Sequence, residues 1–418
     1  MIALAILIAV LALIALRVNL VWALMAGALM VQFTYGAGEL SYFSQDIWAA
    51  MDRQVLLAIP LFVLVGQIMS RGSIAARLIR VIVALTGHLP GGLAMATILS
   101  CAAFSAISGS SIITMLAVGS VLYPALTDNG YSRRFAIGAL CAGGTLGIVI
   151  PPSVPMILYG IMTETSIVSL FRAGIGPGIL LTVAFTLYAV IANWNRPRLA
   201  FSGAELVTAL KQGALAILMP VILLGGIYSG HFSPTEAAAV AIGYALLVEV
   251  LIYREMKIAD YIGTVSQSGI LVGTLFPLLA VAMSINKLLA EKQVPGHLVD
   301  MALHNVESPM AFILIVNGLL LLVGAVMDTG SAIVITAPVL SHIAEAYGYS
   351  PIQLGIIMIL NLEIGILTPP MGMNLIVAMT AFHERFGLIV RSVIPWIVVM
   401  LLCLLLVTLV PWIALALV

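Results

Sequence analysis

The sequence contains very few charged residues. Asp, Glu, Lys and Arg make up 8% of its 418 residues, whereas soluble globular domains hold roughly 25%. Hydrophobic residues account for 62%, and the mean hydropathy is +1.20. This composition excludes an ordinary soluble domain and indicates an integral membrane protein.

Cysteines and clustered basic residues are also scarce. Cys101, Cys141 and Cys403 lie within apolar runs without paired spacing, which is typical of small core residues rather than a disulfide or a metal site. A net charge of zero and the lack of a basic run argue against nucleic acid as a partner. No phosphate loop and no His/Asp or Ser/Lys pair suited to catalysis is present. We therefore expect neither an enzyme nor a cofactor.

Long apolar runs are abundant instead. They approach or exceed the roughly 20 residues that cross a bilayer as a helix. Examples are residues 2–16, 55–69, 180–192 and 393–418. The first run lacks the basic start and cleavage site of a signal peptide, so we predict that it remains as a helix.

One segment of the chain occurs twice. Gly-Tyr-Ser begins at positions 130 and 348, and a Pro-Pro pair at positions 151 and 369, so both markers are 218 residues apart. A shared offset in a chain of 418 residues indicates a duplicated unit. We predict two repeats, at residues 1–200 and 201–418.

Each repeat is predicted to contain a re-entrant helical hairpin and a broken helix. The hairpins are expected at 92–124 and 309–340, since arms of about 15 residues are short for a crossing and the Gly/Ser tips disfavour helix. The broken helices are expected at 135–163 and 352–380, because the Pro-Pro pairs interrupt them. Five crossings and one hairpin per repeat give an all-α polytopic membrane fold with two inverted repeats.

The distribution of basic residues predicts the orientation. With the N-terminus outside, 13 of the 17 Lys and Arg residues fall on the inner face, as the positive-inside rule requires. The outer face then holds Arg53, Arg172, Lys287 and Lys292. The inner residues are Arg17, Arg71, Arg77, Arg80, Arg133, Arg134, Arg196, Arg198, Lys211, Arg254, Lys257, Arg385 and Arg391.

Two hairpin tips that meet two helix breaks within a membrane indicate a secondary transporter. Hydroxyls and carbonyls near Ser105, Ser108, Ser110, Ser111, Gly147, Ile150 and Pro152 form one candidate cation cage. The matching set in the second repeat is Gly324, Asp328, Thr329, Gly365, Thr368 and Met371. Oxygen ligands without imidazole or thiolate favour an alkali cation such as sodium. An organic acid is then predicted to bind at Ser108, Gly109, Ser110, Ser111, Thr329, Gly330 and Asn374.

The sequence also resembles a known family. Ser108-Gly109-Ser110, the passage 123–131, the runs 142–153 and 233–240, and Met327-Asp328 are similar to the large membrane subunit of tripartite ATP-independent periplasmic (TRAP) transporters. The similarity covers essentially the whole chain.

The resemblance implies an elevator-type sodium symporter in the bacterial inner membrane that imports an organic acid, such as a C4-dicarboxylate or a sialic acid. It implies two partners: a small four-helix membrane subunit and a periplasmic binding protein. Its sodium sites would fall on two sets of residues. The first set is Ser105, Ser108, Gly147, Ile150 and Pro152, and the second is Gly324, Gly365, Thr368 and Met371, with Asp328 adjacent.

Two questions stay open at this point. A one-component sodium/divalent-anion symporter that needs no binding protein is the alternative function. Glu363, near Asn361 and just before the second break, is either a hydrogen-bonded structural residue or a further ion or proton site.

Overall fold

The computed structural model describes residues 9, 12, 13, 16, 18, 20–35 and 40–418. All regular elements of this described part are helical. By length and composition, eight of the described helices could cross a membrane, or nine if one bent helix pair counts as a single span. The helix predicted at the extreme N-terminus lies almost entirely outside the described residues.

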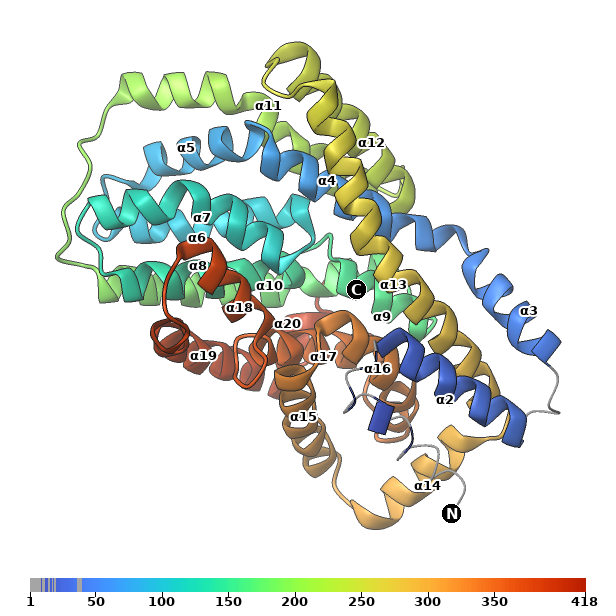
Figure 1. Cartoon of the computed structure of the whole chain (residues 1–418). Helices are drawn as coiled ribbons and strands as arrows, with labels where there is room; N and C mark the ends of the chain where they lie inside the picture. Colours follow the sequence, from blue (N-terminus) through green and yellow to red (C-terminus); the bar gives the residue numbers. More distant parts are fainter. Residues whose placement is uncertain (1–8, 10–11, 14–15, 17, 19, 36–39) are drawn as a thin grey trace.

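The predicted boundary between the two repeats, at residue 200, lies between two long helices (Figure 1). The first half contains α2 (Leu20–Tyr35), α3 (Leu40–Met51), η1 (Gln54–Leu57), α4 (Ala58–Arg71), α5 (Ile74–Thr86), α6 (Gly92–Ser108), α7 (Ser111–Asp128), α8 (Arg133–Val149), α9 (Val154–Met162) and α10 (Ile167–Ala192). The second half contains α11 (Gly203–Tyr228), α12 (Pro234–Leu246), η2 (Leu247–Ile252), α13 (Ile258–Glu291), α14 (Val294–Asn305), α15 (Pro309–Val326), α16 (Thr329–Ala346), α17 (Pro351–Gly365), α18 (Met373–Phe382), α19 (Phe386–Leu409) and α20 (Trp412–Leu415).

Short turns separate consecutive helices in the segments where the sequence predicts hairpins and broken helices, and the helix bounds differ from the predicted ones. The helix pairs α6–α7 and α15–α16 form the hairpins, and their second arms run to Asp128 and Ala346 rather than ending near 124 and 340. Pro124 and Pro338 lie inside these arms without ending them. The second tip is Met327-Asp328, because residues 329–331 already belong to α16.

Two short helices, α5 and α14, are not predicted from the sequence. The offset of 218 residues superposes 74–86 on 292–304, so α5 and α14 occupy equivalent positions in the two repeats. The same offset places α3, η1 and α4 opposite the single 34-residue helix α13. The first repeat therefore has an elbow near Arg53 where the second repeat is continuous.

The core is built around the two broken helices. α8 packs against α6, α7, α10 and α19, and α17 packs against α15, α16, α10 and α19. Residues 136–149 and 353–365 are buried on all sides, which is typical of a central helix. The helices α2, α3 and α13 contact one another at the edge of the molecule, away from this core (Figure 1).

Arginines that the sequence predicts on the inner face form ion pairs with glutamates. Arg77 pairs with Glu255 at 2.6 Å, Arg80 with Glu205 at 2.8 Å and Arg133 with Glu384 at 3.1 Å. The Arg134 guanidinium donates to the carbonyl of Arg391. Arginines predicted on the inner face thus form contacts between segments that are far apart in the sequence.

Candidate functional site

The tip of the first hairpin lies against the break of the first broken helix. Gly109 turns the chain with φ +59°, a left-handed conformation that favours glycine. The backbone amide of Val154 donates to the Gly109 carbonyl at 3.3 Å. A Cβ on Gly109 would lie 3.0 Å from the Pro152 carbonyl oxygen. Residues at the helix break thus donate a hydrogen bond to the tip and leave no room for a side chain at Gly109.

Buried hydroxyls surround this contact. The Ser108 and Thr114 hydroxyls are 2.6 Å apart and fully buried. The Ser105 hydroxyl donates to the Cys101 carbonyl of its own helix at 2.6 Å, which leaves its lone pairs available. Gly147 approaches so closely that a Cβ there would lie 2.5 Å from the Ser110 carbonyl oxygen. Ser108, Ser110 and Gly147 of the predicted set are therefore brought together.

The second tip and the second break meet in a similar way. The amide of Met371 donates to the Ala325 carbonyl at 3.2 Å. Gly324 and Gly365 lie back to back, and a Cβ on Gly365 would be 2.4 Å from the Gly324 carbonyl carbon. The structure thus brings together Gly324 and Gly365, which the sequence assigns to one site. The Met371 side chain is 52% exposed, in keeping with a role limited to its backbone.

Asp328 caps the helix that follows the second tip. Its two carboxylate oxygens accept from the amide and the hydroxyl of Ser331, at 2.9 and 2.6 Å. An ionised carboxylate offers about four lone-pair sites, so this cap leaves acceptor capacity. Thr368 forms a local contact as well, since its hydroxyl donates to the Ile364 carbonyl.

Side chains from the two repeats meet near these tips. The Asn374 amide of α18 donates to the Ser111 hydroxyl of the first hairpin, and both residues are buried. The Asn374 Oδ1 atom has no hydrogen-bond partner in the described part of the chain. At the second tip, the Cβ position of Gly330 lies 3.5 Å from the Leu158 side chain of α9. The predicted substrate residues thus lie on elements of one repeat that contact elements of the other.

Glu363 is fully buried on α17, two residues before its end. Neither carboxyl oxygen forms a hydrogen bond within the described residues. Asn361 has a structural role, because its amide donates to Asn317 at 2.6 Å and to the Ile357 carbonyl at 2.8 Å.

Sequence reasoning missed two polar residues. Thr114 was overlooked, although a hydroxyl three residues beyond Ser111 falls in the first turn of the same hairpin arm. Glu249 was also overlooked, although it is an acid in an apolar helix. It is fully buried and accepts from the Ile74 amide at 2.7 Å and the Ser73 hydroxyl at 3.2 Å. The rule that intramembrane acids have partners or functions would have found it.

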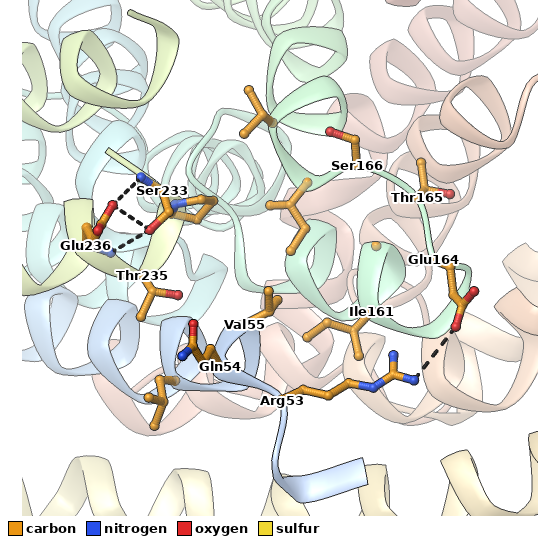
Figure 2. Close-up of a pocket in the computed structure, with 15 residues that line it drawn as sticks. Arg53, Gln54, Val55, Ile161, Glu164, Thr165, Ser166, Ser233, Thr235 and Glu236 are labelled. Carbon is orange, nitrogen blue, oxygen red and sulfur yellow. Dashed lines mark hydrogen bonds and ion pairs between the residues drawn. The ribbon is translucent and has the colours of Figure 1, made fainter. Parts of the chain in front are cut away.

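A cavity of about 830 Å³ opens beside α9, away from the tips (Figure 2). The start of α12 lines one side of it and the loop between α9 and α10 the other. Figure 2 shows the Arg53 side chain extending along this cavity toward Glu164, with 3.7 Å between guanidinium and carboxylate. A second cavity of about 540 Å³ shares Arg53, Ile161 and Glu164 with the first.

The oxygen atoms that could bind a cation at the tips belong to hydroxyl and carbonyl groups. Such ligands fit a hard monovalent cation better than a transition metal. Within the described residues, no group of three or more His, Cys, Asp and Glu side chains could hold a metal ion. The fold and these tips define a polytopic all-helical membrane protein with paired hairpins and broken helices at its centre.

Comparison with known proteins identifies the family. Residues 7–413 match the family model of the tripartite ATP-independent periplasmic transporter, DctM component, and the chain belongs to this family. It is 39% identical over 395 residues to the C4-dicarboxylate TRAP transporter large permease protein DctM of Pseudomonas aeruginosa, covering 91% of this chain and 92% of the relative. It is 33% identical over 378 residues to the sialic acid TRAP transporter large permease protein SiaM of Vibrio cholerae, covering 89% and 88%.

A solved structure has a similar fold. The YdaH transporter of Alcanivorax borkumensis superposes with a TM-score of 0.65 at 15% identity, covering 90% of this chain and 88% of that one. At this identity the likeness concerns the fold alone. The relatives named above are permeases, and the present chain is a large permease subunit of a TRAP transporter.

Proposed function

We propose that the protein is the sodium-coupled importer subunit of a TRAP transporter for an organic acid, which a periplasmic binding protein delivers. The observation that carries the proposal is the contact of each hairpin tip with a helix break, from Val154 to Gly109 and from Met371 to Ala325. Such irregular backbone within a membrane persists only where protein or a polar cavity surrounds it. Secondary transporters use such places to bind their substrates and coupling ions.

The residues proposed to bind sodium lie on both sides of each contact. In the first repeat they are Ser105, Ser108, Gly147, Ile150 and Pro152, and in the second they are Gly324, Asp328, Gly365, Thr368 and Met371. Support comes from buried hydroxyls around Ser108 and from the lack of side chains at Gly147, Gly324 and Gly365, which lets carbonyls approach. In this proposal sodium is a transported ion, and the protein contributes the oxygen ligands.

The proposed substrate site lies between the tips. It uses Ser108, Gly109, Ser110 and Ser111 of the first hairpin, Thr329 and Gly330 of the second, and Asn374. The amide groups at the starts of α7 and α16 suit a carboxylate. The names of the relatives, a C4-dicarboxylate and a sialic acid permease, support an organic acid as the substrate class.

We propose an elevator movement in which the hairpins and broken helices travel as one body. The sequence-based prediction places all the other helices in a static scaffold, but α10 and α19 pack against α8 and α17, so we propose that these two helices belong to the moving body. The remaining helices would form the static scaffold. One of them, α4, contacts the first hairpin near its tip. There a Cβ on Gly66 would lie 2.9 Å from the Ser108 carbonyl oxygen.

Family membership implies a small membrane subunit and a periplasmic binding protein as partners. We further propose that the small subunit has four helices and binds the scaffold, that the complex resides in the bacterial inner membrane, and that the N-terminus is periplasmic. No cofactor and no catalytic step enter this function.

The test is uptake of radiolabelled C4-dicarboxylates and sialic acids into liposomes that contain this chain and its small subunit. We expect uptake only with binding protein and an inward sodium gradient together. Uptake that persists when potassium replaces sodium would contradict sodium coupling. Uptake that needs sodium but no binding protein would favour the one-component symporter instead.

A further inference from the structure

The candidate substrate site lacks a basic residue, although the proposed substrate is an anion. None of the proposed substrate residues carries a positive charge. The predicted outer face holds only Arg53, Arg172, Lys287 and Lys292. Two of these four, Arg53 and Lys287, line the two adjoining cavities beside α9. The scarce positive charge of the outer face is therefore concentrated where these cavities meet.

The first cavity has the size and the donors to hold a small organic acid. Its volume of about 830 Å³ falls within the roughly 300–1,000 Å³ of small-molecule sites. Thr165, Ser166 and Thr235 contribute hydroxyl groups to its lining, and Arg53 is the one Lys or Arg among the described residues that line it (Figure 2). Arg53 also lines the second cavity, together with Lys287 and His342.

The two acids of the first cavity differ in their contacts. Glu236 is engaged in a capping box, in which its carboxylate accepts from the amide and the hydroxyl of Ser233 at 2.8 and 2.9 Å. Glu164 is 81% exposed and lies 3.7 Å from Arg53, beyond the 2.7–2.9 Å of a tight charge-assisted bond. Such an exposed pair is worth only about 0–1 kcal/mol. Another carboxylate can therefore replace Glu164 at little cost.

We propose that Arg53 is an outer vestibule site, which receives the carboxylate of the arriving organic acid in exchange for Glu164. The planar guanidinium binds a carboxylate through two parallel hydrogen bonds. The nine residues of α9 then separate this vestibule from the first helix break by about 13 Å of helix. The anion is thereby collected next to the element that leads to the tips. This inference rests on the proposed function and on the predicted orientation.

The test compares Arg53→Gln with Glu164→Gln in the liposome assay, as a function of the concentration of loaded binding protein. Removing the cation should raise the apparent KM by roughly threefold to tenfold, the scale of a lost charge-assisted contact. Removing the competing carboxylate should lower the apparent KM. The maximal rate should change less than twofold in both variants. Arg53→Lys keeps the positive charge, so it should raise the apparent KM less than Arg53→Gln does. Arg172→Gln is the matched control, an exposed outer-face arginine outside both cavities, and should leave KM unchanged.

Several outcomes overturn the proposal. If both glutamine variants raise KM, the pair is only a structural strut. If neither changes KM, the vestibule has no role in transport. If the affinity of the binding protein for Arg53→Gln membranes falls by the same factor as KM rises, the residue serves protein docking. A wild type that needs no sodium would contradict the proposed function while leaving the KM comparison of the two variants readable.

Discussion

At the scale of single residues, the pair Gly324 and Gly365 leaves no room for an added side chain. A methyl group on Gly365 would lie 2.4 Å from the Gly324 carbonyl carbon and 2.9 Å from the Ala325 amide. The obstacle is backbone, so relief requires the second hairpin to move away from α17. Overpacking of this kind typically costs about 1–3 kcal/mol. We expect Gly365→Ala to lower the melting temperature of the purified protein and to reduce uptake by more than tenfold.

Gly318→Ala is the control for this change. It lies on the same hairpin, in α15, and has no neighbouring atom within 4 Å of a new Cβ. Alanine is favoured over glycine in a helix by roughly 0.5–1 kcal/mol, so the melting temperature should be unchanged or higher. Full activity in Gly365→Ala would show that the close approach of the two glycines is dispensable.

Sodium dependence is predicted to respond to Ser108 and Asp328. Ser108→Ala removes a buried hydroxyl next to Thr114, and Asp328→Asn keeps an oxygen for the helix cap while removing the charge. Each should raise the sodium concentration for half-maximal uptake several-fold. Ser120→Ala is the control. Ser120 lies on the first hairpin, as Ser108 does, and its hydroxyl donates to the Ala117 carbonyl of its own helix. Wild-type sodium dependence in both variants would remove these residues from the proposed sites.

At the scale of elements, Glu249 is predicted to hold the turn between α4 and α5. Its carboxylate caps the start of α5 through the Ile74 amide, and a Cβ on Gly72 would collide with it at 2.2 Å. Glu249→Ala leaves a buried donor without a partner, a loss of about 1–3 kcal/mol. Thermal unfolding in detergent should detect this loss, and Glu249→Gln, which keeps an acceptor, should restore part of it.

Glu255→Ala provides the matched comparison for Glu249. Glu255 pairs with Arg77, but its side chain is 48% exposed, and such pairs contribute about 0–1 kcal/mol. An equal loss of stability in the alanine variants of Glu249 and Glu255 would show that burial of the first carboxylate brings no additional stability.

The sequence predicts the irregular elements better than the regular ones. Pro-Pro pairs and a Gly-Ser tip interrupt a helix through local backbone effects. The breaks before Val154 and Met373 could therefore be located from the sequence. The helix α5 could not, because its charged residues interrupt the apolar run by which a membrane helix is recognised. The helix α13 continues through Pro277 and packs against α2, α3 and α4.

The candidate site was predictable only in its parts. Repetition singled out Ser108, Gly147, Gly324 and Gly365, and the structure brings the members of each repeat together. The contact between Ser111 and Asn374 joins positions 263 residues apart. No local pattern encodes such a distance, and it follows only from the packing of α18 against α7.

At the scale of the whole molecule, the Ser111–Asn374 contact is predicted to couple the two repeats during transport. Because each residue is buried and serves the other, removing either partner should abolish the same interaction. We therefore expect Ser111→Ala and Asn374→Ala each to reduce uptake, and the double variant to be little worse than either. Non-additive effects of this kind are expected only for residues in contact.

The control for this double-mutant cycle is a pair of residues that lie on the same two elements but do not contact each other. Ser111→Ala with Thr380→Ala meets this need, since Thr380 lies on α18 with its hydroxyl bonded to its own helix. Effects in that pair should add. Additive effects in the Ser111 and Asn374 pair would instead mean that the first hairpin and α18 act independently. The hairpins and broken helices could then not be treated as a single moving body.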